Sequence, residues 1–250
     1  MSGQIEGRNP VLEALRAGRE INKLLVAKGN REGSIREVLG AARALGVIIQ
    51  EVDKARLDTL APGRNHQGVI AMVAAHTYVD VDVILAKAAE AGQDPLVLVL
   101  DGIEDPQNLG SLLRTADAAG AHGVIIPERR ASGLTETVAK VSAGAIEYVP
   151  VARVTNITRT LEELKQRKLW VAGTHQDARD LYHQARLTGP LAVVVGNEGK
   201  GISRLVAEQC DFMVRLPMVG HVTSLNAAVA GAILLYEIRK QRDAAAARPR

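Results

Sequence analysis

The chain has 250 residues, of which 47% are hydrophobic, and a net charge of +3 with histidines neutral. This length allows one large domain or two small ones with a substantial core. No apolar run approaches the roughly 20 residues of a membrane helix, and the N-terminus lacks the features of a signal peptide. We therefore expect a cytoplasmic protein without membrane contact.

The numbers of cysteine, histidine and aromatic residues exclude several kinds of bond and binding site. The single cysteine, Cys210, cannot form an internal disulfide, which suits a reducing compartment. One cysteine and six scattered histidines do not make a usual zinc site, so no metal is expected. Aromatic residues are only 2% of the chain, which excludes base stacking as the main mode of nucleic-acid binding.

The charge is unevenly distributed. Residues 1–76 hold 11 Lys and Arg against 8 Asp and Glu, whereas the remaining residues hold 20 of each sign. An N-terminal excess of basic groups fits contacts with phosphates, which supply the sequence-independent part of nucleic-acid affinity. Three charges also fit an ordinary solvated surface, so both interpretations stay open.

The first 76 residues alternate between helix and strand. Asn9 followed by Pro10 is typical of a helix start, Gly18 is typical of a helix end, and Ser34 is a second candidate cap. We expect helices at 9–17, 35–45 and 54–60, and strands at 21–27, 47–52 and 69–73. The segment 1–76 is therefore predicted to be a small α/β domain.

Residues 77–94 are expected to be a linker with one short helix, and residues 95–242 a second domain. Its strands are predicted at 96–100, 124–126, 145–151, 169–172, 191–195 and 213–216, and its helices at 110–119, 135–141, 158–167 and 223–240. This alternation predicts the α/β class, with a mostly parallel sheet and helices on both faces. Residues 243–250 are expected to form a disordered tail.

A loop with three glycines follows the apolar run at 191–195. The spacing of Gly196, Gly199 and Gly201 is neither the G-x-G-x-x-G of dinucleotide sites nor a phosphate-binding Gly-Lys-Ser/Thr loop. A tight turn that serves only geometry is one interpretation. Glu198 favours a binding role, because it is a carboxylate between two glycines at a strand end.

Three motifs resemble those of one enzyme family. They are Asn108-x-x-x-x-x-Arg114, NEGKGIS at 197–203, and LPMVG with SLNAAVA at 216–220 and 224–230. Their order and spacing are similar to those of the SpoU (TrmH) RNA ribose 2'-O-methyltransferases of the SPOUT superfamily. The segment RNHQG at 64–68 extends the resemblance to the RlmB type, which acts on a guanosine of 23S ribosomal RNA.

This resemblance implies a fold and partners. It implies a deep trefoil knot in the second domain and an RNA-binding module like ribosomal protein L30e in the first. It also implies S-adenosylmethionine as cofactor, 23S ribosomal RNA or a ribosome precursor as partner, and a homodimer paired through the last helix. The small residues at 227–232 would let another helix approach, although a buried helix of the same chain would look alike.

The resemblance also implies the site residues. The catalytic candidates are Arg114, Asn108, Glu198, Ser224 and Asn226, and the cofactor-binding candidates are Gly196, Leu216, Leu225, Thr174 and Met218. Arginine is effectively always protonated, so we expect Arg114 to clamp a phosphate and stabilise the forming alkoxide rather than act as base. The phosphate, Glu198 or water would then take the proton. For Asn108, Ser224 and Asn226, helix capping is the structural alternative.

Four side chains are candidate RNA contacts. Arg8 and Arg64 are the stronger ones, and His66 is the weaker, because a histidine that caps a turn is more common. Arg129 follows a predicted strand in a charged loop, where it could lie along RNA or simply be solvated. His175 and His221 are expected to be surface or structural residues.

Other functions remain as alternatives. A transfer RNA ribose methyltransferase is the runner-up within the class, and an RNA-binding protein without catalysis is the runner-up outside it. The intact motif residues argue against the second. A nicotinamide-dependent oxidoreductase is disfavoured, because no G-x-G-x-x-G with an acidic partner is present.

Overall fold

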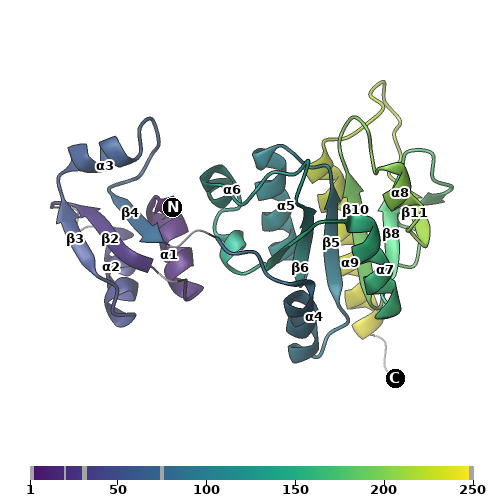
Figure 1. Ribbon diagram of the computed structural model, residues 1–250, viewed down its shortest axis with the longest axis horizontal. Helices are drawn as coiled ribbons and strands as arrows, with labels where there is room; N and C mark the ends of the chain where they lie inside the picture. The colour runs from purple at the N-terminus through teal and green to yellow at the C-terminus, as the bar shows by residue number, and fades with distance from the viewer. Residues whose placement is uncertain (1–2, 20, 30–32, 74–75, 248–250) are drawn as a thin grey trace. The chain divides into compact units, whose positions relative to one another are not determined.

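The computed structural model describes residues 3–19, 21–29, 33–73 and 76–247 (Figure 1). The chain divides into two compact units, each considered by itself. The first comprises Met1–Thr77 and Leu134–Tyr148, and the second comprises Tyr78–Gly133 and Val149–Arg250. This division differs from the predicted one, because 78–94 belongs to the second unit and 134–148 to the first.

The first unit contains a four-stranded sheet in the order β1-β4-β2-β3. Strand β2 pairs parallel with β3 and antiparallel with β4, which pairs antiparallel with β1. The elements are β1 (Gly3–Glu6), α1 (Arg8–Arg16), β2 (Ile21–Ala27), α2 (Ile35–Ala44), β3 (Ile49–Val52), α3 (Lys54–Leu60), β4 (Val69–Val73), α6 (Glu136–Val141) and the 3-10 helix η1 (Ala145–Glu147).

Alternating side chains place a core on each face of this sheet. Leu24 and Val26 of β2 pack with the buried residues of α1 and α2. Leu25, between them, packs with Leu57 of α3 on the opposite face. Successive strand residues point to opposite faces, so one apolar run serves both cores.

The second unit contains a seven-stranded sheet in the order β7-β6-β5-β10-β8-β11-β9, in which every strand pair is parallel. Its elements are α4 (Val81–Glu90), β5 (Leu96–Asp101), α5 (Pro106–Ala119), β6 (Gly123–Pro127), β7 (Val151–Val154), α7 (Ile157–Gln166), β8 (Trp170–Thr174), β9 (Asp180–Leu181), β10 (Leu191–Gly196), α8 (Arg204–Ala207), β11 (Phe212–Arg215) and α9 (Ala227–Ala246). The predicted α/β class with a mostly parallel sheet is therefore confirmed.

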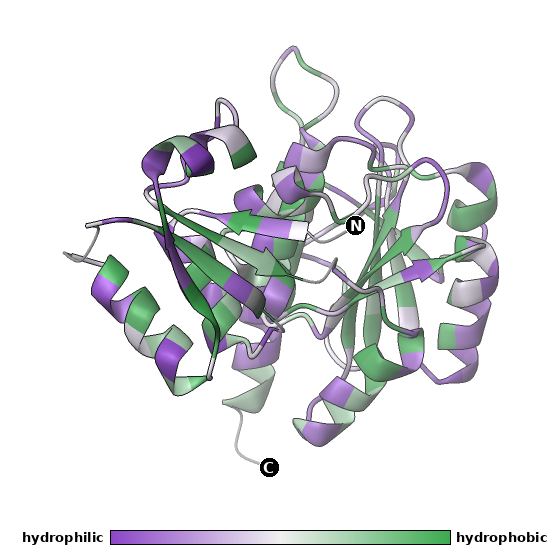
Figure 2. Cartoon of the chain, turned by 60° about the vertical axis from the view of Figure 1, so that its left-hand side comes forward, coloured by the Kyte–Doolittle hydropathy of each residue, from purple (hydrophilic) through white to green (hydrophobic). Residues whose placement is uncertain are grey.

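Helices cover both faces of this sheet. Ala192 and Val194 of β10 belong to a core shared with residues of α4, α7 and α8. On the other face α9 packs against α5, and Gly231 lies so close to Leu112 that a Cβ there would overlap its side chain. The central strands are mostly hydrophobic, whereas the helices mix hydrophobic and hydrophilic residues (Figure 2). This pattern is typical of a parallel sheet buried between helix layers.

Several predicted boundaries are wrong. Helix α5 begins at Pro106 rather than 110, because Asp105 caps it with a hydrogen bond from the Gln107 amide. The strand predicted at 145–151 is replaced by η1 and by β7, which starts only at Val151. Gly144, with φ 96°, turns the chain there. Strand β1 lies in a stretch for which no strand was predicted.

The C-terminal end also differs from the prediction. Helix α9 begins at Ala227 rather than 223 and continues to Ala246, so residues 243–246 are helical and not part of a disordered tail. Residues 248–250 of that predicted tail lie outside the described residues. The trefoil knot and the likeness to ribosomal protein L30e stay predictions. Among the described residues, no helix is long and apolar enough to cross a membrane.

Candidate active site

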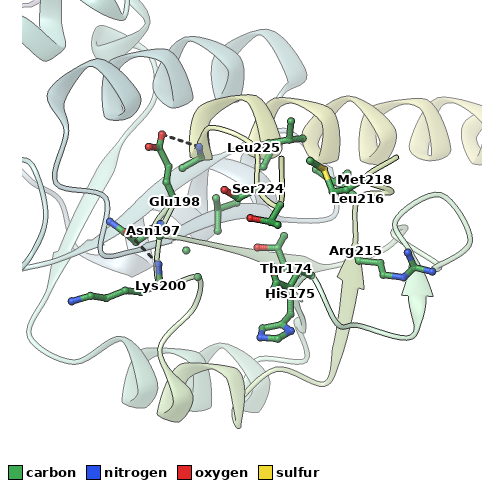
Figure 3. A pocket seen from close by; sticks show the side chains of 18 of the residues that line it. Thr174, His175, Asn197, Glu198, Lys200, Arg215, Leu216, Met218, Ser224 and Leu225 are labelled. Carbon is green, nitrogen blue, oxygen red and sulfur yellow. Dashed lines mark hydrogen bonds between the residues drawn. The ribbon is translucent and has the colours of Figure 1, made fainter. Parts of the chain in front are cut away.

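A cavity of about 490 Å³ lies at the carboxyl ends of β8, β10 and β11 (Figure 3). Loops that leave parallel strands at this edge are where open α/β sheets bind ligands. All five side chains or backbone positions predicted to bind a cofactor line this cavity. They are Thr174, Gly196, Leu216, Met218 and Leu225.

The loop after β10 folds back on itself in a tight turn. The Asn197 amide donates to the Gly201 carbonyl at 3.1 Å, and the Gly201 amide donates to the Asn197 carbonyl at 2.8 Å. A Cβ at Gly196 would overlap the backbone of Gly201 and Ile202. The glycine at 196 is therefore required by the close approach of the chain's own backbone.

Asn197 fixes this loop, although sequence reasoning assigned it no role. Its side-chain oxygen accepts from the Gly199 amide at 2.9 Å, and its side-chain nitrogen donates to the Gly102 carbonyl at 3.0 Å. The second bond ties the loop to the end of β5. Asparagine commonly forms such turns with the backbone two residues on, which is the signal that could have identified it.

Three predicted catalytic residues are joined by hydrogen bonds. The Glu198 Oε1 atom accepts from the Asn108 side chain at 2.9 Å, from the Ala227 amide at 3.2 Å, and from the Asn226 side chain. The Asn226 nitrogen also donates to the Asn108 oxygen at 2.8 Å. This network connects α5, the glycine loop and the start of α9. One carboxylate oxygen thus holds together segments that are far apart in the sequence.

Helix capping was the structural alternative for Asn226, Asn108 and Ser224, and only the first of them caps a helix. Asn226 is the N-cap of α9, and its oxygen accepts from the amides of Ala228 and Val229, so it caps and takes part in the network. Asn108 is not a cap, because Asp105 occupies that position in α5. Ser224 lies before the helix and is exposed in the cavity wall.

Arg114 does not line the cavity. It is exposed on α5, six residues after Asn108, which corresponds to about 9 Å along a helix axis. Its side chain forms no hydrogen bond or ion pair with any residue in the described part of the chain. The guanidinium is therefore available to a ligand that approaches from outside the cavity.

The predicted RNA contacts have varied surroundings. His66 is buried; its Nε2 lies 2.9 Å from Asp58 and its Nδ1 accepts from the Gly68 amide, as expected of a turn-capping histidine. Arg64 pairs with Glu6 at 3.2 Å and with Glu136. Arg8 donates to the Gln67 carbonyl and to Ser34. Arg129 is exposed in the turn after β6.

A parallel α/β unit with a mixed polar and apolar cavity at its carboxyl edge is typical of a protein that binds a small molecule there. The SpoU rRNA Methylase family profile matches residues 95–236, and the profile "RNA 2'-O ribose methyltransferase substrate binding" matches residues 4–79. The chain belongs to the SpoU methylase family. It is therefore an S-adenosylmethionine-dependent RNA methyltransferase.

Relatives and solved structures agree with this family. The chain is 51% identical over 237 residues to the "Putative TrmH family tRNA/rRNA methyltransferase YacO" of Bacillus subtilis, covering 95% of each chain. It is similar to the SpoU methyltransferase AviRb of Streptomyces viridochromogenes in complex with AdoMet, with TM-score 0.82, 27% identity, and 96% and 90% coverage. An AdoMet-bound rRNA methyltransferase of Sinorhizobium meliloti gives TM-score 0.77, 26% identity, and 96% and 87% coverage.

Proposed function

We propose that the protein transfers the methyl group to a ribose 2'-hydroxyl, and that the target is a guanosine of 23S ribosomal RNA, free or in a ribosome precursor. The observation that carries the reaction is the network of Asn108, Glu198 and Asn226 beside the cavity. The substrate-binding profile over residues 4–79 supports a ribose target. The similarity over 96% of the chain to the rRNA methyltransferase of Sinorhizobium meliloti supports ribosomal RNA.

The cavity fits the cofactor in size and in lining. Its volume of about 490 Å³ is in the usual range for small-molecule sites. Leu216, Met218 and Leu225 offer an apolar wall for the adenine, while Thr174 and the backbone at Gly196 offer polar contacts. When bound, S-adenosylmethionine supplies an electrophilic methyl group. The chain's own residues must position the ribose and stabilise the charge on its oxygen.

Arg114 is assigned the charge-stabilising role in this proposal. A hydroxyl is a weak nucleophile unless its developing negative charge is stabilised. An exposed guanidinium on α5 can clamp the neighbouring phosphate and face the forming alkoxide without losing its proton. The Oε1 atom of Glu198 is occupied by three donors, so this residue serves first to hold the site together. The proton passes to the phosphate, to the other oxygen of Glu198 or to water.

The homodimer belongs to the same proposal. Val229 and Tyr236, seven residues apart on α9, are 47% and 54% exposed. Val219 and Val222, in the loop before that helix, are also exposed. An apolar stripe along the last helix is the surface that the family resemblance assigns to the second subunit. Light scattering should then give twice the mass of one chain.

Methyl transfer from radiolabelled S-adenosylmethionine to deproteinised ribosomal RNA tests the proposal. We expect label on a ribose 2'-oxygen of 23S RNA, and loss of at least 100-fold in rate for Arg114→Ala, as for removal of one transition-state donor. The matched control is Arg159→Ala, because Arg159 is exposed on α7 and pairs only with Glu163 within the described chain. It should retain full activity.

The same assay separates the alternatives. Label on transfer RNA alone would replace the ribosomal target with a transfer RNA target. No label on ribosomal RNA, transfer RNA or precursor particles would leave an RNA-binding protein without catalysis. Equal rates for Arg114→Ala and the wild type would remove Arg114 from the mechanism.

A further inference from the structure

A second cavity, of about 560 Å³, lies in the second unit away from the candidate active site. Trp170 and Phe212, which are the only tryptophan and the only phenylalanine of the chain, both line it. They are the first residues of β8 and β11, so the cavity is at the amino ends of these strands. Thr174, at the other end of β8, lines the cofactor cavity. Trp170 and Thr174 are four residues apart on β8, so about 13 Å of strand separates the two cavities.

Strand pairing explains why these side chains share one face. Phe212 pairs with Ala172, two residues after Trp170 on β8. Asp180 of β9 pairs with Val214, two residues after Phe212. Side chains an even number of residues apart on paired strands point to the same face. The sheet therefore presents two aromatic rings and one carboxylate together at its edge.

The opposite wall of the cavity is a loop, 182–190, that the last helix holds in place. The Gln241 side chain accepts from the Leu187 amide at 2.9 Å and donates to the Ala185 carbonyl at 3.2 Å. Arg242 donates to the Gly189 carbonyl at 2.6 Å. Because three such bonds already fix this wall, it does not have to be ordered when a ligand binds. The entropic cost of binding is therefore lower.

The chemistry of the lining suits a planar, polar-edged ligand. Trp170 is 60% exposed, and its indole N–H has no acceptor among the described residues. Gln184, Arg186 and Thr188 line the same cavity and offer hydrogen-bond donors and acceptors, with Arg186 donating to Thr188. Lys168, exposed in the turn before β8, adds a positive charge close by. A flat apolar face with polar groups around it and cations nearby is how proteins hold unpaired bases of RNA.

We propose that this cavity binds one unpaired base of RNA, stacked on the indole of Trp170. The inference rests on RNA being the substrate of this family and adds a contact at the edge of the sheet opposite the methyl-transfer site. A protein partner or a second copy fits less well. Apart from the two rings and Pro190, the lining residues are polar or small, whereas the core of a protein interface is mostly apolar.

The single tryptophan makes the test direct, because all tryptophan fluorescence comes from the proposed site. Saturating polyuridylic acid should quench this fluorescence in the full-length protein, whereas a poly(A)·poly(U) duplex, whose bases are paired, should not. Trp170→Ala should weaken polyuridylic acid binding about tenfold, as expected for one lost base–aromatic stack. Trp170→Phe should retain most of the affinity.

The matched control is Leu205→Ala, which removes another exposed apolar side chain of the same unit. Its affinity should equal that of the wild type. Retained S-adenosylmethionine binding shows that each variant is folded. No quenching at saturation, or unchanged affinity in Trp170→Ala, would overturn the proposal. So would a fluorescence shift that depends on protein concentration without RNA, since a second copy would then cover Trp170. None of these results alters the proposed reaction, which the methyl-transfer assay tests separately.

Discussion

At the scale of single residues, two glycines of one loop should respond differently to the same added methyl group. A Cβ at Gly196 would overlap the backbone of Gly201 and Ile202, whereas at Gly199 its nearest neighbour is the Asn197 side-chain oxygen at 3.7 Å. We therefore expect Gly196→Ala to displace the loop and weaken S-adenosylmethionine binding at least tenfold, with Gly199→Ala close to wild type. Isothermal titration calorimetry measures both. Equal affinities would show that the loop adapts without affecting the cavity.

The thiol of Cys210 should be inert in the folded protein. Burial, and then the neighbouring Asp211, raise the pKa of Cys210 to about 12. Only the thiolate reacts, so at pH 8 roughly one molecule in 10,000 is reactive, against about one in four for a free cysteine. A colorimetric disulfide reagent should therefore label the native protein at least 100-fold more slowly than the urea-unfolded protein. Similar rates in both states would mean that the strand β11 region opens readily.

At the scale of elements, helix α9 is held at its far end by Arg242. This side chain donates to the carbonyls of Asp94, Pro95 and Gly189, which lie in the segments leading into β5 and β10. Arg242→Met removes a donor from all three carbonyls, of which Pro95 still accepts from the Leu191 amide. It also removes a buried Nε–H that has no partner within the described chain. We expect the free energy of unfolding to fall by about 2 kcal/mol.

Urea denaturation measures this change, and the neighbouring Arg239 provides the control. Arg239 is exposed and pairs with Asp243 one turn along the same helix. Such pairs contribute about 0.5 kcal/mol or less, so Arg239→Met should unfold almost as the wild type does. If both variants lose the same stability, the loss reflects helix propensity or surface charge rather than the anchoring of the strands.

Elements were predictable from sequence where local pattern and burial agree. Strands β2 and β4 and helix α3 match the predicted bounds, because each is a short apolar or capped run between clear breaks. Strand β1 was missed because Gly-Gln-Ile-Glu has one buried residue, Ile5, and owes its strand form to pairing with β4. The start of α5 differs from the prediction because Gly110 is a buried residue inside the helix, and the capping residue is Asp105.

The residues of the candidate site were also predictable from sequence only in part. The resemblance of the motifs to a known family implied Asn108, Glu198 and Asn226, and the structure joins them by hydrogen bonds. The roles of Asn197 and Trp170 were not predictable from spacing. Asn197 acts through a bond to Gly102, 95 residues earlier, and Trp170 lines a cavity whose far wall depends on α9. Contacts between distant segments exist only once the chain has folded.

At the scale of the whole molecule, stability should decrease on mild acidification. His122 is buried; its Nδ1 accepts from the Leu96 amide at 3.0 Å, so its Nε2 carries the proton and faces the Gln93 oxygen at 3.1 Å. Burial, and then the charges of Arg242 and Lys87, lower the pKa of His122. Burial also lowers the pKa of His76, to about 4. Both histidines therefore stay neutral in the folded protein below the usual histidine pKa of about 6.5.

The unfolded chain takes up these protons as pH falls through about 6.5, whereas the folded chain does not. The unfolded state then binds more protons, so the free energy of unfolding falls with pH by up to about 1.4 kcal/mol per unit for each histidine. Between pH 6.5 and 5, before carboxylates titrate strongly, the Tm should decrease. His122→Asn keeps an acceptor for the Leu96 amide but cannot titrate, so its Tm should decrease less steeply. Parallel Tm curves for the two proteins would mean that His122 accepts a proton without strain in the folded state.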